Sequence, residues 1–248
     1  MQPEDPWEKL RLATRARIGL GRAGDAMKVS DVLDFQFAHA VARDAVHAKL
    51  DLARLKAALP GAICVHSEAE SREQYLRRPD LGRRLHPDCL PLLPRGEYDV
   101  VLVIADGLSA TAVMHNAVPM FEAAAARLGG FRIAPPVIAT QARVALGDDI
   151  GEALGAKLCA IMIGERPGLT VSDSLGVYLT YNPRRGTQDS ARNCISNIHA
   201  HGGLSYGAAG DMLAWLMREA LRRGLTGVGL KEASGLIGGG EGQAALAG

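Results

Sequence analysis

The sequence predicts an α/β protein built on a doubly wound, Rossmann-like parallel sheet. Two near-continuous apolar runs, residues 98–105 and 158–163, are typical of strands buried on both faces of a parallel sheet. Segments with helical periodicity alternate with these runs, as they do in doubly wound folds. Ligands of such sheets bind beyond the carboxyl ends of the strands, so we expect functional residues directly after the apolar runs.

Residues 1–95 are expected to form a smaller, mainly helical N-terminal domain. A short helix is predicted over residues 7–18. Ser30 suits the N-cap of a long helix, and Ser67 and Glu70 have the spacing of a capping box that opens another.

Residues 96–248 are expected to form the sheet domain, after a linker marked by Pro91, Pro94 and Gly96. The glycine-rich tail after Gly235 is expected to be mobile. The other elements expected are strands at 62–65, 131–139 and 177–181, and helices from 109 to about 128, at 149–154 and at 204–223.

Composition excludes several classes of protein. The net charge of +1 offers no broad field for nucleic acid or a membrane surface, and no apolar stretch is long enough to span a membrane. Cys64, Cys89, Cys159 and Cys194 are widely spaced, and no secretory pattern opens the chain, so a reducing cytoplasm fits better than a disulfide framework.

The glycine-rich segment GLGRAG at residues 19–24 matches the dinucleotide-binding pattern G-x-G-x-x-G letter for letter. That function requires a preceding strand, whereas residues 11–18 have a helical pattern. A tight turn between helices, or a subunit contact, is the favoured interpretation.

Two polar pairs invite a chemical role. Asp106 could act as an acid or base and activate Ser109, but either residue could equally cap the helix that follows. His199 and His201 could ligate a metal, but without a third clustered ligand they are more typical of a solvated loop. Neither a catalytic residue nor a metal site is therefore predicted.

The turn after the second apolar run is the most informative local feature. Glu165 and Arg166 stand between Gly164 and Pro167, a combination that allows a sharp turn and close approach of the backbone to a flat ligand. A salt-bridged loop is the alternative. Cys194, in a polar segment expected to be a loop, is by itself more typical of a small buried side chain than of a reactive thiol.

Six segments, taken together and in this order, resemble the light chain of the adenosylcobalamin-dependent ethanolamine ammonia-lyases. The segments are YLRRPDLGRRL at 75–85, DGLS at 106–109, QARVALGDDIGEALGAK at 141–157, GERPGL at 164–169, SDSLGVYLTYNPR at 172–184 and RNCISNI at 192–198.

The resemblance implies that Val144, Glu165 and Cys194 contact the cofactor, which lies between this chain and a heavy chain that holds ethanolamine. The complete enzyme is a lyase that converts ethanolamine to acetaldehyde and ammonia by radical rearrangement, and the light chain alone is expected to be inactive. No histidine sits in the D-x-H-x-x-G pattern that replaces the lower base of cobalamin in some proteins, so the cofactor should keep its own base on cobalt.

Two rival functions stay open at this point. One is a non-catalytic assembly subunit that stabilises the heavy chain, and the other is a dinucleotide-dependent oxidoreductase that uses residues 19–24. The chain begins almost at its first helix, without the longer N-terminal extension associated in some relatives with packing into a bacterial microcompartment. A cytoplasmic location is expected, with the microcompartment as the alternative.

Overall fold

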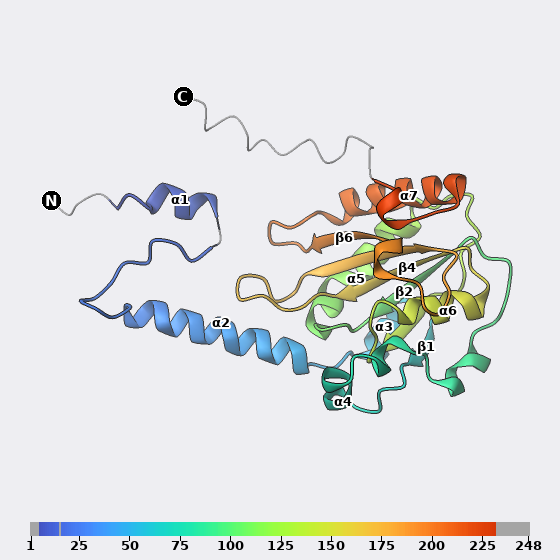
Figure 1. The fold of residues 1–248 in the computed structure, drawn as a ribbon, viewed down its shortest axis with the longest axis horizontal. Coiled ribbons are helices and arrows are strands. Elements are labelled where there is room, and N and C mark those ends of the chain that lie inside the picture. The colour runs from blue at the N-terminus through green and yellow to red at the C-terminus, as the bar shows by residue number, and fades with distance from the viewer. Residues whose placement is uncertain (1–4, 15, 232–248) are drawn as a thin grey trace, which may run out of the picture.

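The computed structural model describes residues 5–14 and 16–231, and the tail after Gly235 lies outside them. A six-stranded sheet in the order β1-β3-β2-β4-β5-β6 forms the centre of the body (Figure 1). The strands are β1 Ile63–His66, β2 Val100–Ala105, β3 Val137–Thr140, β4 Leu158–Gly164, β5 Leu175–Tyr181 and β6 Arg192–Ile198. The helices are α1 Glu8–Ala13, α2 Val29–His47, α3 Leu52–Ala58, α4 Arg72–Arg77, α5 Ala110–Ala125, α6 Leu146–Leu154 and α7 Tyr206–Arg223.

Helices cover both faces of the sheet. Side chains of α3, α5 and α7 pack on one face, against Leu102 of β2 and Leu179 of β5 among others. Side chains of α6 pack on the other face, against Val103 of β2 and Ile161 of β4. Every residue of β2 and β4 is consequently buried, which confirms the α/β class and the two buried strands expected from their apolar runs.

The sheet is only partly parallel, which corrects the expectation of a wholly parallel doubly wound sheet. β1, β3, β2 and β4 run parallel, whereas β5 is antiparallel to β4 and β6 is antiparallel to β5. The cause is the connection: residues 165–174 between β4 and β5 contain no helix, and a parallel crossover needs a longer segment. The segment RNCISNI, expected to be a loop, is the edge strand β6.

Two helix caps differ from those expected. Lys28, not Ser30, is the N-cap of α2, and α2 has no side-chain cap hydrogen bond. Ser71, not Ser67, caps α4 by accepting a hydrogen bond from the Gln74 N–H. The Ser67 hydroxyl instead donates to the Gln141 carbonyl, because β1 brings Ser67 beside the end of β3.

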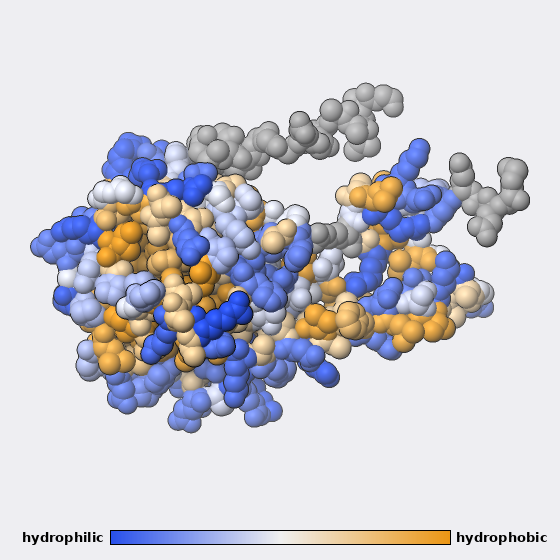
Figure 2. Space-filling model, turned by 180° about the vertical axis from the view of Figure 1, so that it is seen from behind, coloured by the Kyte–Doolittle hydropathy of each residue, from blue (hydrophilic) through white to orange (hydrophobic). Residues whose placement is uncertain are grey.

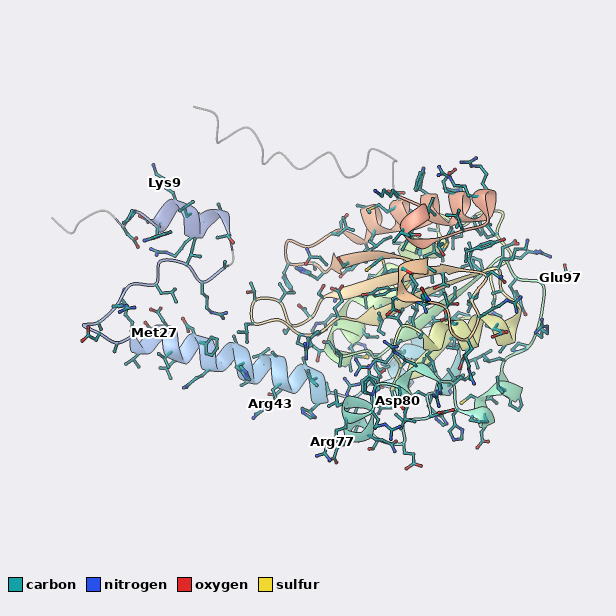
Figure 3. The ribbon with its side chains drawn as sticks, in the orientation of Figure 1. Lys9, Met27, Arg43, Arg77, Asp80 and Glu97 are labelled. Carbon is teal, nitrogen blue, oxygen red and sulfur yellow. The ribbon has the colours of Figure 1, made fainter. Side chains whose placement is uncertain are left out.

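The segment from α1 to α2 extends away from the body as an arm, along which Lys9, Met27 and Arg43 are spaced (Figure 3). Ala45 is the one buried residue of α2, so only the end of this helix packs on the body. Within the described residues, no helix combines the length and apolar character needed to cross a membrane.

Candidate functional site

A crevice opens where the direction of strand order reverses. The chain leaves β2, passes through α5 to β3 on one side of β2, and then passes through α6 to β4 on the other side. The carboxyl end of β2 is thus a topological switch point, the usual ligand position in open α/β sheets. Gly107, just beyond β2, lies so close to β4 that a Cβ on it would stand 2.2 Å from the Gly164 carbonyl oxygen.

Two adjoining hollows, of about 310 and 500 Å³, make up this crevice. Arg143, Val144 and Tyr178 line both of them. Cys194 lies in the first hollow and Glu165 in the second. The structure therefore brings Val144, Glu165 and Cys194, which are far apart in the sequence, to the walls of one crevice.

Asp106 positions the turn that carries Val144. Its two carboxylate oxygens accept hydrogen bonds from the Gln141 N–H at 2.8 Å and the Ala142 N–H at 2.9 Å. Burial raises the pKa of Asp106, and these bonds together with the Arg72 guanidinium at 3.3 Å oppose the shift. Asp106 is therefore a structural residue that joins the end of β2 to the loop after β3.

Ser109 does not hydrogen-bond to Asp106, and no catalytic dyad forms. Its hydroxyl accepts a hydrogen bond from the Ala112 N–H and donates one to the Ser172 carbonyl. The capping interpretation is thus confirmed for Ser109, which caps α5.

Arg143 supplies a cation to both hollows. Its guanidinium lies 4.3 Å from the ring centre of the fully buried Tyr75, on which Arg72 also stacks at 4.7 Å. The Tyr75 hydroxyl donates to the Ala142 carbonyl at 3.0 Å and so holds the same turn. Arg143 Nε is buried and makes no hydrogen bond to any described residue.

Cys194 lies directly across from Tyr178, because these two residues are cross-strand partners on β6 and β5. Its free thiol is in contact with Tyr178 at the first hollow, and the residue is exposed, so the expectation of a small buried side chain is wrong. Desolvation raises the pKa of this thiol, the interaction with Tyr178 opposes that shift, and the charge of Glu165 adds to it. The thiol is therefore protonated at neutral pH and suited to packing rather than to nucleophilic chemistry.

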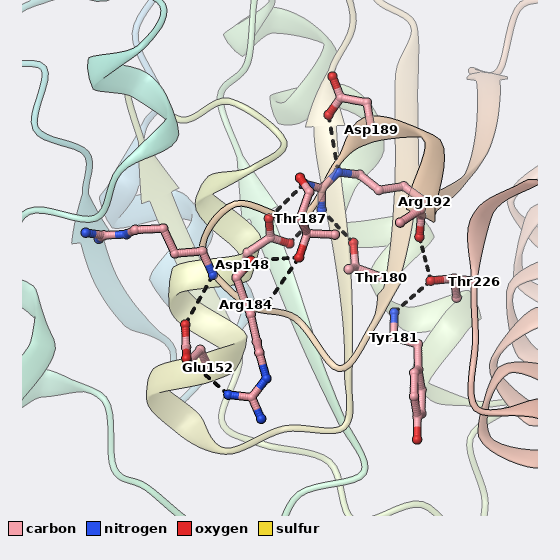
Figure 4. Close-up of polar contacts among 11 residues, drawn as sticks. Asp148, Glu152, Thr180, Tyr181, Arg184, Thr187, Asp189, Arg192 and Thr226 are labelled. Carbon is pink, nitrogen blue, oxygen red and sulfur yellow. Dashed lines mark hydrogen bonds and ion pairs between the residues drawn. The ribbon is translucent and has the colours of Figure 1, made fainter.

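A buried ion pair fixes the start of β6 relative to α6. Arg192 and Asp148 form two parallel hydrogen bonds of 2.6 and 2.7 Å, and both side chains are 2% exposed (Figure 4). Arg192 also donates to the Thr180 hydroxyl and the Thr187 carbonyl. Cys194 is two residues further along β6, so this network sets the position of Cys194 relative to the turn before α6 that carries Val144.

The other candidates are accounted for by local structure. His199 is buried, which corrects the expectation of a solvated loop for this residue, and its ring nitrogens contact the Asn197 side chain and the His201 N–H. In the part of the chain that the structure describes, no three His, Cys, Asp or Glu side chains cluster as metal ligands would.

The glycine-rich loop at residues 19–24 follows α1 through residues 14 and 16–18, which form no strand. Gly19 adopts a positive φ of 58° and packs against Trp7, so closely that a Cβ would stand 2.1 Å from the indole ring. The loop thus has the structural role of letting the chain turn beside α1.

The fold and the crevice define a class of protein: an α/β domain with an open crevice at a topological switch point. Among the described residues, Asp106 and Ser109 form no dyad and no metal-binding cluster is present. The model of one family, Ethanolamine ammonia-lyase light chain (EutC), matches residues 4–231. The chain belongs to this family.

Relatives of known description support the same family assignment. The ethanolamine ammonia-lyase small subunit of Pseudomonas putida (strain GB-1) is 50% identical over 243 residues, which cover 93% of this chain and 89% of that protein. The protein of the same description from Azotobacter vinelandii is 49% identical over 241 residues, or 92% and 89% of the two chains. The chain is accordingly a subunit of a lyase and acts as part of a larger enzyme.

Proposed function

We propose that this chain is the light subunit of an ethanolamine ammonia-lyase and binds adenosylcobalamin in the crevice, against a heavy chain that holds ethanolamine. One observation carries the proposal: Val144, Glu165 and Cys194, the three positions that match the cofactor contacts of the family, line two adjoining hollows. They come from a turn, a strand exit and an edge strand, which only the folded chain unites.

The chemistry of the crevice fits a large flat ligand with polar edges. Val144 and Tyr178 offer apolar surface, Arg143 lines both hollows, and Glu165 Oε1 makes no hydrogen bond to any described residue. The rim of a corrin carries amides, which a carboxylate can accept from and a guanidinium can donate to. When bound, the cofactor would supply the radical by homolysis of its cobalt–carbon bond, and this chain's residues bind and orient it.

A heavy chain is needed because the crevice is open. The two hollows are open to solvent, so this chain can cover one side of a large cofactor and a partner must cover the other. Titration with adenosylcobalamin, followed by corrin absorbance, should show weak binding to the isolated chain and tight binding to the mixture with its heavy chain. Equal, tight binding in both cases would contradict a site shared between subunits.

Glu165→Gln tests the cofactor contact within that complex. We expect it to weaken cofactor binding by about 1.5 to 3 kcal/mol, the value of a hydrogen bond to a charged group. Glu122→Gln, on the exposed side of α5, is the matched control and should leave binding unchanged. If Glu165→Gln keeps full cofactor affinity, the rival function gains support, namely an assembly subunit that stabilises the heavy chain without contributing to cofactor binding.

Two finer proposals go with this function. The segment before residue 96 and the segment after it are proposed as two domains, although β1 of the former pairs with β3 of the latter. The protein is proposed to be cytoplasmic, with packing in a bacterial microcompartment as the alternative that cell fractionation would reveal. Nucleotide that co-purifies with the chain would favour a dinucleotide oxidoreductase instead.

A further inference from the structure

The register of the β4–β5 hairpin sets Ser174 opposite Glu165. Gly164 pairs with Leu175, and the next pair outward is Glu165 with Ser174, joined by a hydrogen bond of 3.0 Å from the Glu165 N–H to the Ser174 carbonyl. The Ser174 side chain is thereby brought to the side chain of Glu165 at the edge of the second hollow.

The two carboxylate oxygens of Glu165 are used unequally. Oε2 accepts a hydrogen bond of 2.5 Å from the Ser174 hydroxyl and another of 3.3 Å from the Asn197 N–H. Oε1 makes no hydrogen bond to any residue that the structure describes. The protein thus holds the carboxylate by one oxygen and leaves the other for a donor from outside the chain.

The Asn197 N–H reaches Glu165 through an unusual backbone conformation at the end of β6. Asn197 has a φ of 61°, in the left-handed region, which non-glycine residues adopt when surrounding contacts enforce it. Its side-chain oxygen contacts His199 Nε2 at 3.0 Å, and its carbonyl accepts from the Leu204 N–H at 2.8 Å. These contacts account for the buried His199, which had no role in the cofactor contacts.

Gly176 makes room for this arrangement. A Cβ at position 176 would stand 3.0 Å from Glu165 Oε1 and 3.2 Å from Glu165 Cγ. A side chain at position 176 would therefore crowd the Glu165 side chain where it lies over β5, and glycine leaves it room.

We infer that Ser174 is a positioning residue, which acts with the Asn197 N–H to hold Glu165 Oε2 so that Oε1 is presented to the cofactor. This inference rests on the proposed function. It predicts that removing the Ser174 hydroxyl weakens cofactor binding only through Glu165. The inference is therefore tested by the energetic coupling between the two side chains, and a loss of cofactor affinity in the Ser174 variant alone does not suffice.

The test is a double-mutant cycle in the complex with the heavy chain, titrated with adenosylcobalamin by corrin absorbance. Ser174→Ala should raise the dissociation constant about 3- to 10-fold, less than the loss of a direct hydrogen bond to a charged group would, because the Asn197 N–H still holds Glu165 Oε2. Ser174→Thr, which keeps the hydroxyl, should restore binding to within about twofold. Ser30→Ala, an exposed serine on α2, is the control and should not change the constant.

The decisive comparison is the variant with both Glu165→Ala and Ser174→Ala. It should bind as Glu165→Ala alone does, because no carboxylate remains to be positioned. If Ser174→Ala has no effect, or lowers affinity equally in the two backgrounds, the inference is wrong while the cofactor site stands. If Glu165→Ala itself leaves affinity unchanged, the proposed cofactor contact is wrong and the inference falls with it. Thermal unfolding of each isolated variant checks that none has lost its fold.

Discussion

Single residues show what a sequence motif can and cannot reveal about this site. Val144 and Glu165 were predicted because the motifs around them are distinctive, and the structure sets both in one crevice. Arg143 and Ser174 were not predicted, although both lie in segments that carry the resemblance. Their roles depend on a stacking contact with Tyr75 and on the hairpin register, which become visible only when distant segments are brought together.

At this scale, the buried Arg192–Asp148 ion pair leads to a prediction about the stability of the fold. Arg192→Met should lower the free energy of unfolding by about 3 to 5 kcal/mol, because it leaves Asp148 buried without its partner. Arg184→Met is the matched control: Arg184 pairs with Glu152 at the surface, where loss of the pair costs about 1 kcal/mol or less. Chemical denaturation measures both. A similar small loss in the two variants would show that the buried pair contributes no more than a surface one.

Elements were predictable where burial determines composition. β2 and β4 are covered on both faces, so their sequences are apolar throughout and reveal strands. β6 lies at the sheet edge with several exposed residues, so its sequence is polar and resembles that of a loop. Strand direction was mistaken for β5, because periodicity does not encode direction, and only the short helix-free connection from residues 165 to 174 indicates a hairpin.

Asp99 gives a pH-dependent prediction for how the elements are joined. It precedes β2 and binds the Arg132 N–H at 3.0 Å and Lys157 Nζ at 2.9 Å, so it links the approaches to β3 and β4. These contacts lower the pKa of the Asp99 carboxyl group, and the hydrogen bond from the Arg132 N–H has the largest effect. A lowered pKa in the folded state means that Asp99 stabilises the fold fully above the usual carboxyl pKa, and that this contribution is lost as the pH falls below it.

Asp99→Asn should therefore lower the free energy of unfolding by about 1 kcal/mol at pH 7. The difference from the unaltered chain should begin to narrow below about pH 5 and keep narrowing below pH 3, as denaturant titrations at several pH values would measure. Asp34→Asn, at an exposed position of α2, is the control and should change stability by no more than about 0.5 kcal/mol. A difference that stays constant down to pH 3 would show that the charge of Asp99 is not what stabilises these junctions.

On the scale of the whole molecule, the body and the α1–α2 arm differ in how far their apolar side chains are buried. The body encloses its apolar side chains on the two faces of the sheet. The arm leaves them exposed, and Figure 2 shows hydrophobic surface along it. Leu12 is 86% exposed, Val29 73% and Phe37 72%. A helix with this distribution gains little stability from tertiary packing within its own chain.

Phe37→Ser should accordingly change the free energy of unfolding of the isolated chain by no more than about 0.5 kcal/mol, because the ring is already mostly exposed in the folded chain. The same substitution at Phe121, which packs from α5 against the core, is the matched comparison and should cost at least about 2 kcal/mol. Denaturant unfolding of the two variants measures both values. A loss at Phe37 as large as that at Phe121 would mean that in solution α2 folds back and buries this ring, and that the arm does not extend from the body as Figure 1 shows it.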